Sequence, residues 1–396
     1  MPFDGTVFVT QVIEWLHLYA SKGFKFDLYV MLSITQIFDK SYLKYQKSSI
    51  NKYTRLFQSF IFLFPSRGFY LYLNSIFFIT KTFFWLLKYD NVVIMSRATI
   101  GTEVKILKTI FPNKINFVLD CRASGGEEKF YLIKKNGLYD KPSFNILGHI
   151  FKIEMINYNT ADRILVVSNK LKEYIIQNFR IKDEKFQFYP CLSDRKKFFY
   201  SEQLRNHFRK EMGYLADDIV ILYAGGLSAK WHVSRFILDF YSYLHLLSNR
   251  FKFMFLSADV DDLNSLLSNY PMLKECCVCR YVSNSEVVNY LNVADFGTLF
   301  REDTIMNNVA SPTKFAEYML AGLPTLISPG VGDYSRFVED KKVGIVVDIK
   351  NFNNVNFNDL LYFKFDRNQI AVDAISIFDK GFLLDDMCKL FKEFKE

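Results

Sequence analysis

The sequence predicts an α/β fold with parallel sheets and two domains. Helical and short β-rich apolar segments alternate along the chain, which is typical of parallel strands joined by crossover helices. The 396 residues give room for two domains, at about 100 to 200 residues each. Half of the residues are hydrophobic and 17% are aromatic. The chain can therefore bury a large core, and a disordered protein is excluded.

In the first half of the chain, the alternation begins with a helix and an extended run. Helical periodicity covers residues 10–21, and the extended run follows at 24–32. Apolar runs of strand length then recur and predict further strands at 91–96, 115–120 and 163–168. We expect these strands to form the sheet of an amino-terminal domain.

An apolar segment at residues 69–87 has about the length of a bilayer span. Lys81 and Asn74 interrupt it, and a strand-like run at 89–95 follows. A helix buried in the α/β domain is therefore the preferred prediction, with a membrane span as the alternative. Just upstream, residues 40–57 interleave basic and aromatic side chains. This pattern is typical either of a surface that contacts an anionic membrane or of a solvated basic face.

A proline and a charged, irregular stretch at residues 185–200 mark the domain boundary. We predict an amino-terminal domain over 1–185, a second domain over 186–375, and a final amphipathic helix within 376–396 that packs back on the first domain. The second domain repeats the alternation of helix and strand at residues 201–212, 218–226, 231 onward and 251–258.

The net charge limits the classes of ligand that we expect, and the cysteines indicate the cellular compartment. The net charge of +8 and the pI near 8.9 suit an anionic ligand or an acidic membrane surface. The sequence has no RNA-binding signature and no Cys/His finger spacing, so nucleic acid is not an expected partner. Three cysteines crowd into residues 276–279 without a nearby histidine, so we expect buried thiols in a reducing cytoplasm. The amino terminus has no signal-peptide pattern.

Residues 311–328 are predicted to form a short helix that runs into a strand. Ser311 is a preferred N-cap residue, and Pro312 fits the first helical position. Gly322 and Pro324 end the helix before an apolar run.

Two charged residues stand near the start of this helix. Lys314 lies in the first turn, where the helix dipole is already positive, so an opposing anion would favour it. Glu317 lies three residues on and shares that face. The two side chains either hold the two ends of one ligand or form a surface ion pair that is worth little.

A glycine pair and an arginine add to this candidate anion site. Gly225 and Gly226 end a predicted strand, and Lys230 follows them. Glycines allow a phosphate to approach the backbone, although a glycine pair is also typical of a simple turn. The spacing matches neither a dinucleotide fingerprint nor a Walker loop. Arg301 ends another apolar run, so we expect Arg301, Lys230 and the helix start to converge beyond the strand ends, as a diphosphate requires.

Three segments together resemble the GT-B enzymes of glycosyltransferase family 4, especially those that build bacterial surface polysaccharides. They are "ADRILVVSNKLKEYI" at 161–175, "ILYAGGLSAKW" at 221–231 and the helix segment at 311–328. The resemblance covers about residues 160–350 and is weak over the first 110. It implies two Rossmann-like domains that face each other across a cleft, with a nucleotide-diphosphate sugar bound by the second domain.

The resemblance also implies roles for single residues. The glutamate that matches Glu317 holds the ribose hydroxyls in that family, while Lys230 and Arg301 would cover the diphosphate. Two positions depart from the family pattern. Val309 stands where a second glutamate often lies, eight residues before Glu317, and Gly226 stands where many members carry an arginine. The second departure suggests that Arg301 supplies the missing charge.

In the first domain, residues 115–130 resemble the Asp-x-Arg-Gly loop of related polysaccharide enzymes. Asp120 is expected to orient or deprotonate the acceptor hydroxyl, and Arg122 to hold an acceptor phosphate. An Asp-Arg pair that merely caps the strand is the alternative. Gly5 and Thr6 are expected to form the facing loop of the cleft. No strand precedes Gly5, so we expect a late start or a differently built sheet edge.

Together, these features predict a glycosyltransferase, and the resemblance implies that the enzyme retains the anomeric configuration. It would move a hexose-type residue from a nucleotide-diphosphate donor to an acceptor hydroxyl, with a lipid-linked saccharide of surface polysaccharide synthesis as the expected acceptor. We expect no cofactor and no metal, because no Asp-x-Asp couple stands where it would carry one. The expected location is the cytoplasm, at the inner face of the membrane. The alternatives are a GT-B sugar-nucleotide epimerase and a non-catalytic GT-B partner subunit.

Overall fold

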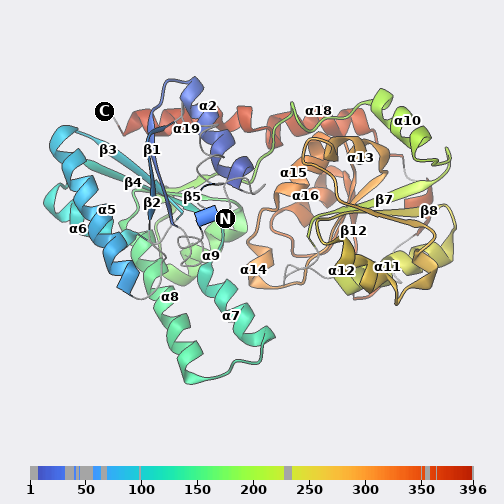
Figure 1. Cartoon of the computed structure of the whole chain (residues 1–396), viewed down its shortest axis with the longest axis horizontal. Coiled ribbons are helices and arrows are strands. Elements are labelled where there is room, and N and C mark those ends of the chain that lie inside the picture. The colour runs from blue at the N-terminus through green and yellow to red at the C-terminus, as the bar shows by residue number, and fades with distance from the viewer. Residues whose placement is uncertain are drawn as a thin grey trace. The chain divides into compact units, whose positions relative to one another are not determined.

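The computed structural model describes most of the chain (Figure 1). The described residues are 8–31, 40–41, 44, 57–63, 69–97, 100–226, 234–348, 350–352, 357–362 and 364–394. The chain divides into two compact units, and the longest segment of the second begins at Pro190. Unit 1 comprises Met1–Val166, Ile175–Tyr189 and Leu383–Glu396, and unit 2 comprises Val167–Tyr174 and Pro190–Phe382.

The strands of unit 1 are parallel, as the sequence predicted. Among the described residues, four of them form a sheet in the order β3-β4-β5-β6. Their bounds are Val92–Ser96 (β3), Ile115–Cys121 (β4), Arg163–Val166 (β5) and Phe186–Phe188 (β6). A separate parallel pair joins β1 (Phe26–Met31) and β2 (Phe57–Leu63). The strands expected at 24–32, 91–96, 115–120 and 163–168 are thus confirmed as β1, β3, β4 and β5.

Helices accompany the strands of unit 1 (Figure 1). The helix expected at 10–21 begins with a π-helical turn at Val9–Ile13 (η1) and continues as α2 (Glu14–Ser21). The others are α5 (Phe69–Lys88), α6 (Gly101–Ile110), α7 (Gly125–Lys135), α8 (Lys141–Thr160), the 3₁₀ turn η3 (Asp183–Lys185) and most of α19 (Lys380–Glu393). A further helix, α9 (Asn169–Phe179), begins in unit 2 and ends in unit 1.

The apolar segment at 69–87 forms the helix α5, but only one face of it is buried. Thr82 and Leu86 are at most 1% exposed, whereas Ile76, Phe84 and Leu87 are more than 60% exposed. The segment is therefore a helix of unit 1, as preferred, but it buries one face and exposes the other. No helix of the described chain combines the length and apolar character that a bilayer crossing requires.

The carboxyl-terminal helix α19 packs within unit 1. Lys22 after α2 forms an ion pair with Asp385, and the rings of Tyr19 and Phe391 meet edge to face at 5.2 Å. The side-chain amide of Asn116 donates to the carbonyl of Phe394. The chain therefore returns to its first domain after completing the second.

Unit 2 contains a parallel sheet whose strand order is β12-β11-β10-β7-β8-β9 among the described residues. The bounds are β7 (Ile219–Ala224), β8 (Phe251–Leu256), β9 (Cys277–Arg280), β10 (Phe296–Leu299), β11 (Thr325–Ile327) and β12 (Gly344–Val346). The strands predicted at 218–226 and 251–258 are confirmed. The chain builds the sheet outward from β7 in one direction and from β10 in the other, so these two strands form the topological switch point.

Helices and 3₁₀ turns connect the strands of unit 2. They are α10 (Glu202–Glu211), α11 (Ser234–Leu247), α12 (Val260–Leu267), η4 (Pro271–Leu273), α13 (Val287–Val293), α14 (Ile305–Asn308), α15 (Thr313–Leu320), α16 (Tyr334–Lys341), α17 (Phe357–Tyr362) and α18 (Arg367–Phe378). The first, α10, confirms the helix predicted at 201–212. Two large apolar clusters pack in this unit, one of them rich in Phe and Tyr.

Arg367 at the start of α18 is a buried cation held by backbone carbonyls. Its guanidinium donates to the carbonyls of Leu291, Asn292 and Ala294 at the end of α13, and of Ala321 and Gly322 after α15. Burial lowers the pKa of this side chain to about 9. Because the carbonyls at helix ends carry partial negative charge, they stabilise the guanidinium. Arg367 thereby ties three helices together.

We expect Arg367→Met to lower the free energy of unfolding by about 3 kcal/mol, because the helix-end carbonyls lose a charged donor. Urea unfolding followed by circular dichroism measures the change. Arg336→Met on α16 is the control, since the Arg336 side chain is 85% exposed. It should shift the stability by less than about 0.5 kcal/mol. Equal effects in the two variants would contradict a structural role for Arg367.

Candidate functional site

Predicted donor-site residues gather at the carboxyl ends of β7 and β10. Gly225 and Gly226 follow β7 directly, and Arg301 lies two residues after β10. These two strands pair with each other at the switch point of the sheet. Open α/β sheets bind ligands outside the carboxyl ends of their strands at such a point. The structure therefore brings the glycine pair and Arg301 to the edge of the sheet where a ligand is expected.

Arg301 is held in place by its backbone and by one amide. Its N–H donates to the Ser328 hydroxyl at 2.8 Å, and that hydroxyl donates to the Arg301 carbonyl at 2.9 Å. The guanidinium lies 3.5 Å from the side-chain oxygen of Asn307. Asn307 is 1% exposed and donates to the Glu302 carbonyl. Sequence reasoning missed Asn307. Thr304, the N-cap residue three positions earlier, is the feature of the sequence that could have placed Asn307 in a helix start.

The charge of Arg301 is desolvated. Burial lowers the pKa of its guanidinium, and the neighbours that raise it are Tyr223 and Cys191 rather than a carboxylate. Neither of these two neighbours is an acid. The desolvated guanidinium is therefore suited to an anionic ligand, because the ligand would supply the missing counter-charge.

Shared neighbours connect Arg301 to the other predicted residues. Tyr223 approaches Arg301 and donates its hydroxyl to the carbonyl of Gly226 at 3.1 Å. Cys191 also approaches Arg301, and its N–H donates to the Ser311 hydroxyl at 3.0 Å. Gly226 and Ser311 are thus each hydrogen-bonded to a residue that acts electrostatically on Arg301.

Ser311 does not cap the helix as predicted. The N-cap of α15 is Pro312, and no side chain caps it. The hydroxyl of Ser311 instead accepts from Cys191 and shares a 2.7 Å hydrogen bond with Tyr334. Because these internal partners occupy the hydroxyl and Ser311 is 7% exposed, it positions the segment before α15. The predicted helix end is confirmed, since Gly322 follows α15 with a φ of 59°.

Lys314 and Glu317 form an ion pair in which the acid, Glu317, is buried. The Lys314 ammonium donates to the Glu317 carboxylate at 2.8 Å. The Glu317 side chain is 4% exposed, whereas that of Lys314 is 30% exposed. The alternative of an ordinary surface pair is therefore excluded. Tyr318 links this pair to the switch point, because its hydroxyl accepts from the N–H of Ala224 in β7.

Two predicted residues at the carboxyl edge of the unit 1 sheet lie together. Asp120 in β4 is 3% exposed, and its carboxylate lies 2.6 Å from the guanidinium nitrogens of both Arg122 and Arg97. Arg97 follows β3 and also donates to the carbonyl of Gln11 at 2.7 Å. The Arg122 guanidinium stacks on the Tyr189 ring, 4.6 Å from its centroid. Arg97 was missed in the sequence because its partner lies on the next strand.

This environment keeps Asp120 ionised. Burial raises the pKa of its carboxyl, but Arg122 and Arg97 outweigh burial and bring the pKa below its ordinary value. A general base works best with a pKa near the working pH. The geometry thus favours the Asp-Arg pair at the strand end, enlarged by Arg97, over the deprotonating role expected for Asp120.

The glycine pair after Arg122 begins a helix. Gly125 and Gly126 open α7, where the N–H of Gly125 donates to the Glu154 carboxylate at 2.6 Å. A side chain at Gly126 would lie 2.2 Å from the Phe151 ring. Gly126 therefore serves close packing. Lys230, Gly5 and Thr6 lie outside the described residues, so their roles stay predictions.

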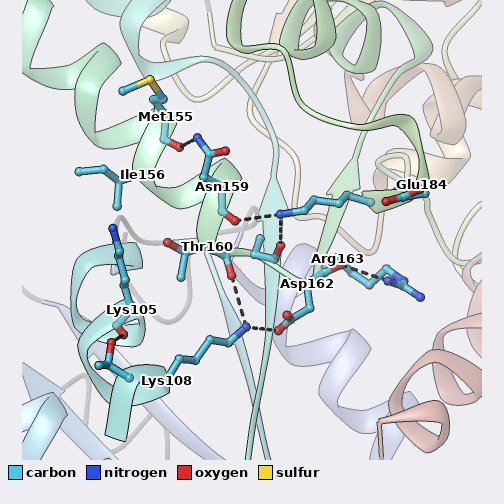
Figure 2. A pocket seen from close by; sticks show the side chains of 12 residues that line it. Lys105, Lys108, Met155, Ile156, Asn159, Thr160, Asp162, Arg163 and Glu184 are labelled. Atoms are coloured by element: carbon cyan, nitrogen blue, oxygen red, sulfur yellow. Dashed lines mark hydrogen bonds and ion pairs between the residues drawn. The ribbon is translucent and has the colours of Figure 1, made fainter. Parts of the chain in front are cut away.

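A pocket of about 840 Å³ in unit 1 lies at the opposite edge of its sheet (Figure 2). It includes Asp162, which precedes β5, and residues of α6 and α8. Two of its lysines are engaged in hydrogen bonds within the protein. Lys108 donates to the Asp162 carboxylate, and Lys185 donates to the carbonyls of Asn159 and Ala161 at 2.8 Å. This pocket is therefore distinct from the predicted sites at the carboxyl ends of the strands.

Solved structures of glycosyltransferases share this fold. Sucrose-phosphate synthase from Thermosynechococcus elongatus aligns with a TM-score of 0.65 and 12% identity, over 93% of this chain and 98% of that one. HepE of Anabaena, in complex with UDP and glucose, gives 0.63 and 12% over 97% and 96%. WaaG, a glycosyltransferase involved in lipopolysaccharide biosynthesis, gives 0.57 and 13% over 92% and 98%.

The likeness establishes the fold as two Rossmann-like domains of the GT-B type, which confirms the predicted fold class. No protein-family model matches the sequence, and no curated protein matches it.

The ion pairs of Asp120 predict a specific dependence of stability on pH. Asp120→Asn removes the charge that balances two arginines, so we expect it to lower the free energy of unfolding at pH 7 by about 3 kcal/mol. Because the folded-state pKa lies below the ordinary 3.8, the wild-type contribution is complete above about pH 4 and is lost as the pH falls further. Thermal unfolding between pH 7 and pH 3 measures it.

The difference between wild type and Asp120→Asn should therefore shrink below about pH 4. Asp90→Asn is the matched control, because Asp90 also pairs with a cation of unit 1 but is fully exposed. It should leave the profile unchanged. A pH-independent difference between wild type and Asp120→Asn would refute the assignment of the ion pairs as the cause.

Proposed function

We propose that this protein is a retaining glycosyltransferase of family 4, which moves a sugar from a nucleotide-diphosphate donor to an acceptor hydroxyl. One observation carries the proposal: the desolvated guanidinium of Arg301 lies beside the Gly225–Gly226 turn at the switch point of a GT-B sheet. The fold supports it, because glycosyltransferases such as WaaG are among the similar solved structures, and HepE was crystallised with UDP and with UDP-glucose.

On the donor side, we assign Arg301, Lys230 and the start of α15 to the diphosphate. Positive charge held ready at the leaving group stabilises the negative charge that develops as the sugar bond breaks. Glu317 accepts hydrogen bonds from the ribose hydroxyls, and Lys314 holds its carboxylate in position. Asn307 and Ser328 position Arg301.

On the acceptor side, Asp120 anchors the guanidiniums of Arg97 and Arg122. Their side chains are 35% and 18% exposed, so part of each reaches the surface. Paired guanidiniums bind phosphate through directional, charge-assisted hydrogen bonds. We therefore assign this cluster to the phosphate of a lipid-linked saccharide in surface polysaccharide synthesis, at the cytoplasmic face of the membrane. Gly5 and Thr6 would complete the acceptor side.

Binding of nucleoside diphosphates tests the donor site. We expect one of UDP, GDP and CDP to stabilise the protein in a thermal-shift titration, by about 2.7 kcal/mol at 100 times its dissociation constant. Arg301→Met should weaken that diphosphate at least about tenfold, because it removes a charged donor to phosphate. The same variant should leave the nucleoside without phosphates unaffected.

Glu317→Gln should instead reduce the preference for ribose over 2′-deoxyribose in the preferred nucleotide. Arg235→Met is the control, since this arginine of unit 2 has a side chain that is 89% exposed. Stabilisation by no nucleotide would argue for a non-catalytic partner subunit. If Arg301→Met weakened the binding of the nucleoside as much as that of the nucleoside diphosphate, this would contradict the assignment of Arg301 to the phosphates.

Turnover tests the proposed chemistry and its independence of metals. Slow hydrolysis or transfer of the preferred nucleotide sugar should persist in excess EDTA, because side chains of this protein supply the positive charge. Lys230→Ala should lower the rate at least about tenfold. Proton NMR of the first sugar released should show the anomeric configuration of the donor. A rate restored only by added Mg²⁺ or Mn²⁺, or an inverted product, would overturn these assignments, and an epimerised sugar would identify the epimerase alternative.

A further inference from the structure

The connection between α7 and α8 exposes a group of large apolar side chains. Phe130 lies on α7, Leu138 and Tyr139 lie in the connection, and Phe144 and Ile146 lie on α8. They are between 42% and 63% exposed. Figure 1 shows this connection at the end of the helical hairpin that lies farthest from the strands of the unit 1 sheet. Soluble proteins rarely gather apolar side chains in this way without a binding partner.

The hairpin is ordered by its own hydrogen bonds. At the end of α7, the N–H of Leu138 donates to the carbonyl of Ile133 at 3.0 Å around Gly137, whose φ is 64°. At the start of α8, Asp140 caps the helix by accepting from the N–H of Ser143 at 2.7 Å. In this type of helix end the residue at the position of Leu138 often packs back on the helix, but here it is 44% exposed. The apolar side chains are therefore presented outward by a fixed backbone.

Positive charge surrounds these apolar side chains. Residues 130–146 contain three lysines and one aspartate, so their formal charge is +2. The acids Glu127, Glu128 and Glu154 lie farther along the two helices from the connection. Lys134, Lys135 and Lys141 flank the connection and are exposed. Asp140, the single acid, is engaged at the start of α8.

We infer that the tip of this hairpin docks on an anionic membrane surface. Aromatic and aliphatic side chains enter the boundary between headgroups and acyl chains, while lysines remain among the anionic headgroups. The long lysine stems suit that boundary because they lie along apolar surface and keep the ammonium in water. The inference rests on the proposed function, since it would bring the enzyme to a lipid-linked acceptor. It assigns the contact to residues 130–146.

Vesicle co-sedimentation tests the docking surface. The full chain should bind vesicles with 30% anionic phosphatidylglycerol more tightly than pure phosphatidylcholine vesicles, and added salt should weaken the binding. Lys134→Gln, Lys135→Gln and Lys141→Gln together should lower the partition coefficient at least about tenfold. The triple variant Leu138→Ser, Tyr139→Ser and Phe144→Ser should lower it by a similar factor on anionic vesicles.

The matched control is Leu215→Ser with Leu246→Ser, two residues of unit 2 that are each 65% exposed. It should bind like the wild type. Unchanged binding in both hairpin variants would overturn the inference, as would indifference of the wild type to anionic vesicles. Loss of binding in the control alone would also overturn it. Circular dichroism checks that each variant is folded.

A fluorescence measurement locates the contact directly. Leu138→Trp should add tryptophan emission that brominated lipid quenches, whereas Leu246→Trp should add emission that it does not quench. The reverse result would refute the docking surface. Nucleotide binding in the thermal-shift assay is independent of vesicles. A protein that binds a nucleoside diphosphate but no vesicle therefore refutes only the docking surface, whereas one that binds vesicles but no nucleotide refutes the proposed function.

Discussion

The pairing of β7 with β10 is the contact on which the rest of unit 2 depends. Asp295, just before β10, accepts from the N–H of Val220 in β7 and forms ion pairs with Arg205 and Arg209 of α10. Within β10, a side chain at Gly297 would lie 2.6 Å from the ring of Tyr318. Only glycine therefore lets α15 approach the strand. The sheet grows away from this pair on both sides, so loops far apart in sequence meet where the two strands end.

The charged clusters of the two units differ in the sign of the charge that is removed from water. In unit 1, the carboxylate of Asp120 is almost fully buried, and two arginines neutralise it. The cluster thus has more positive than negative charge, and part of the excess faces outward on Arg97. In unit 2, Arg301 is half-buried near tyrosine and cysteine, with an amide as its hydrogen-bond partner. A desolvated charge of this kind costs free energy that a bound anion returns. Both arrangements suit phosphate-containing ligands, but only the second leaves the counter-charge to the ligand.

Local sequence patterns predicted the strands and the meeting of the glycine pair with Arg301 at the ends of β7 and β10, because strand periodicity and strand-end position are local properties. The glycine pair and Arg301 could be expected to meet for this reason. The partners of these residues could not, since they depend on tertiary packing. Serine is a preferred N-cap residue, yet the hydroxyl of Ser311 forms hydrogen bonds with Cys191 and Tyr334 from distant parts of the chain. Arg97 is likewise joined to Asp120 across neighbouring strands, which no spacing along the chain reveals.

The lysine in the first turn of α15 illustrates how packing overrides local preference. At this position the helix dipole disfavours a cation by about 0.3–1 kcal/mol. However, Glu317 is 3% exposed, and an unpaired buried carboxylate would cost several kcal/mol. Lys314 donates to a single oxygen of that carboxylate, Oε2. A carboxylate accepts about four hydrogen bonds, so the oxygens of Glu317 keep capacity for further donors while Lys314 stays paired. The ion pair thus balances the charge of the buried carboxylate and leaves it able to accept further hydrogen bonds.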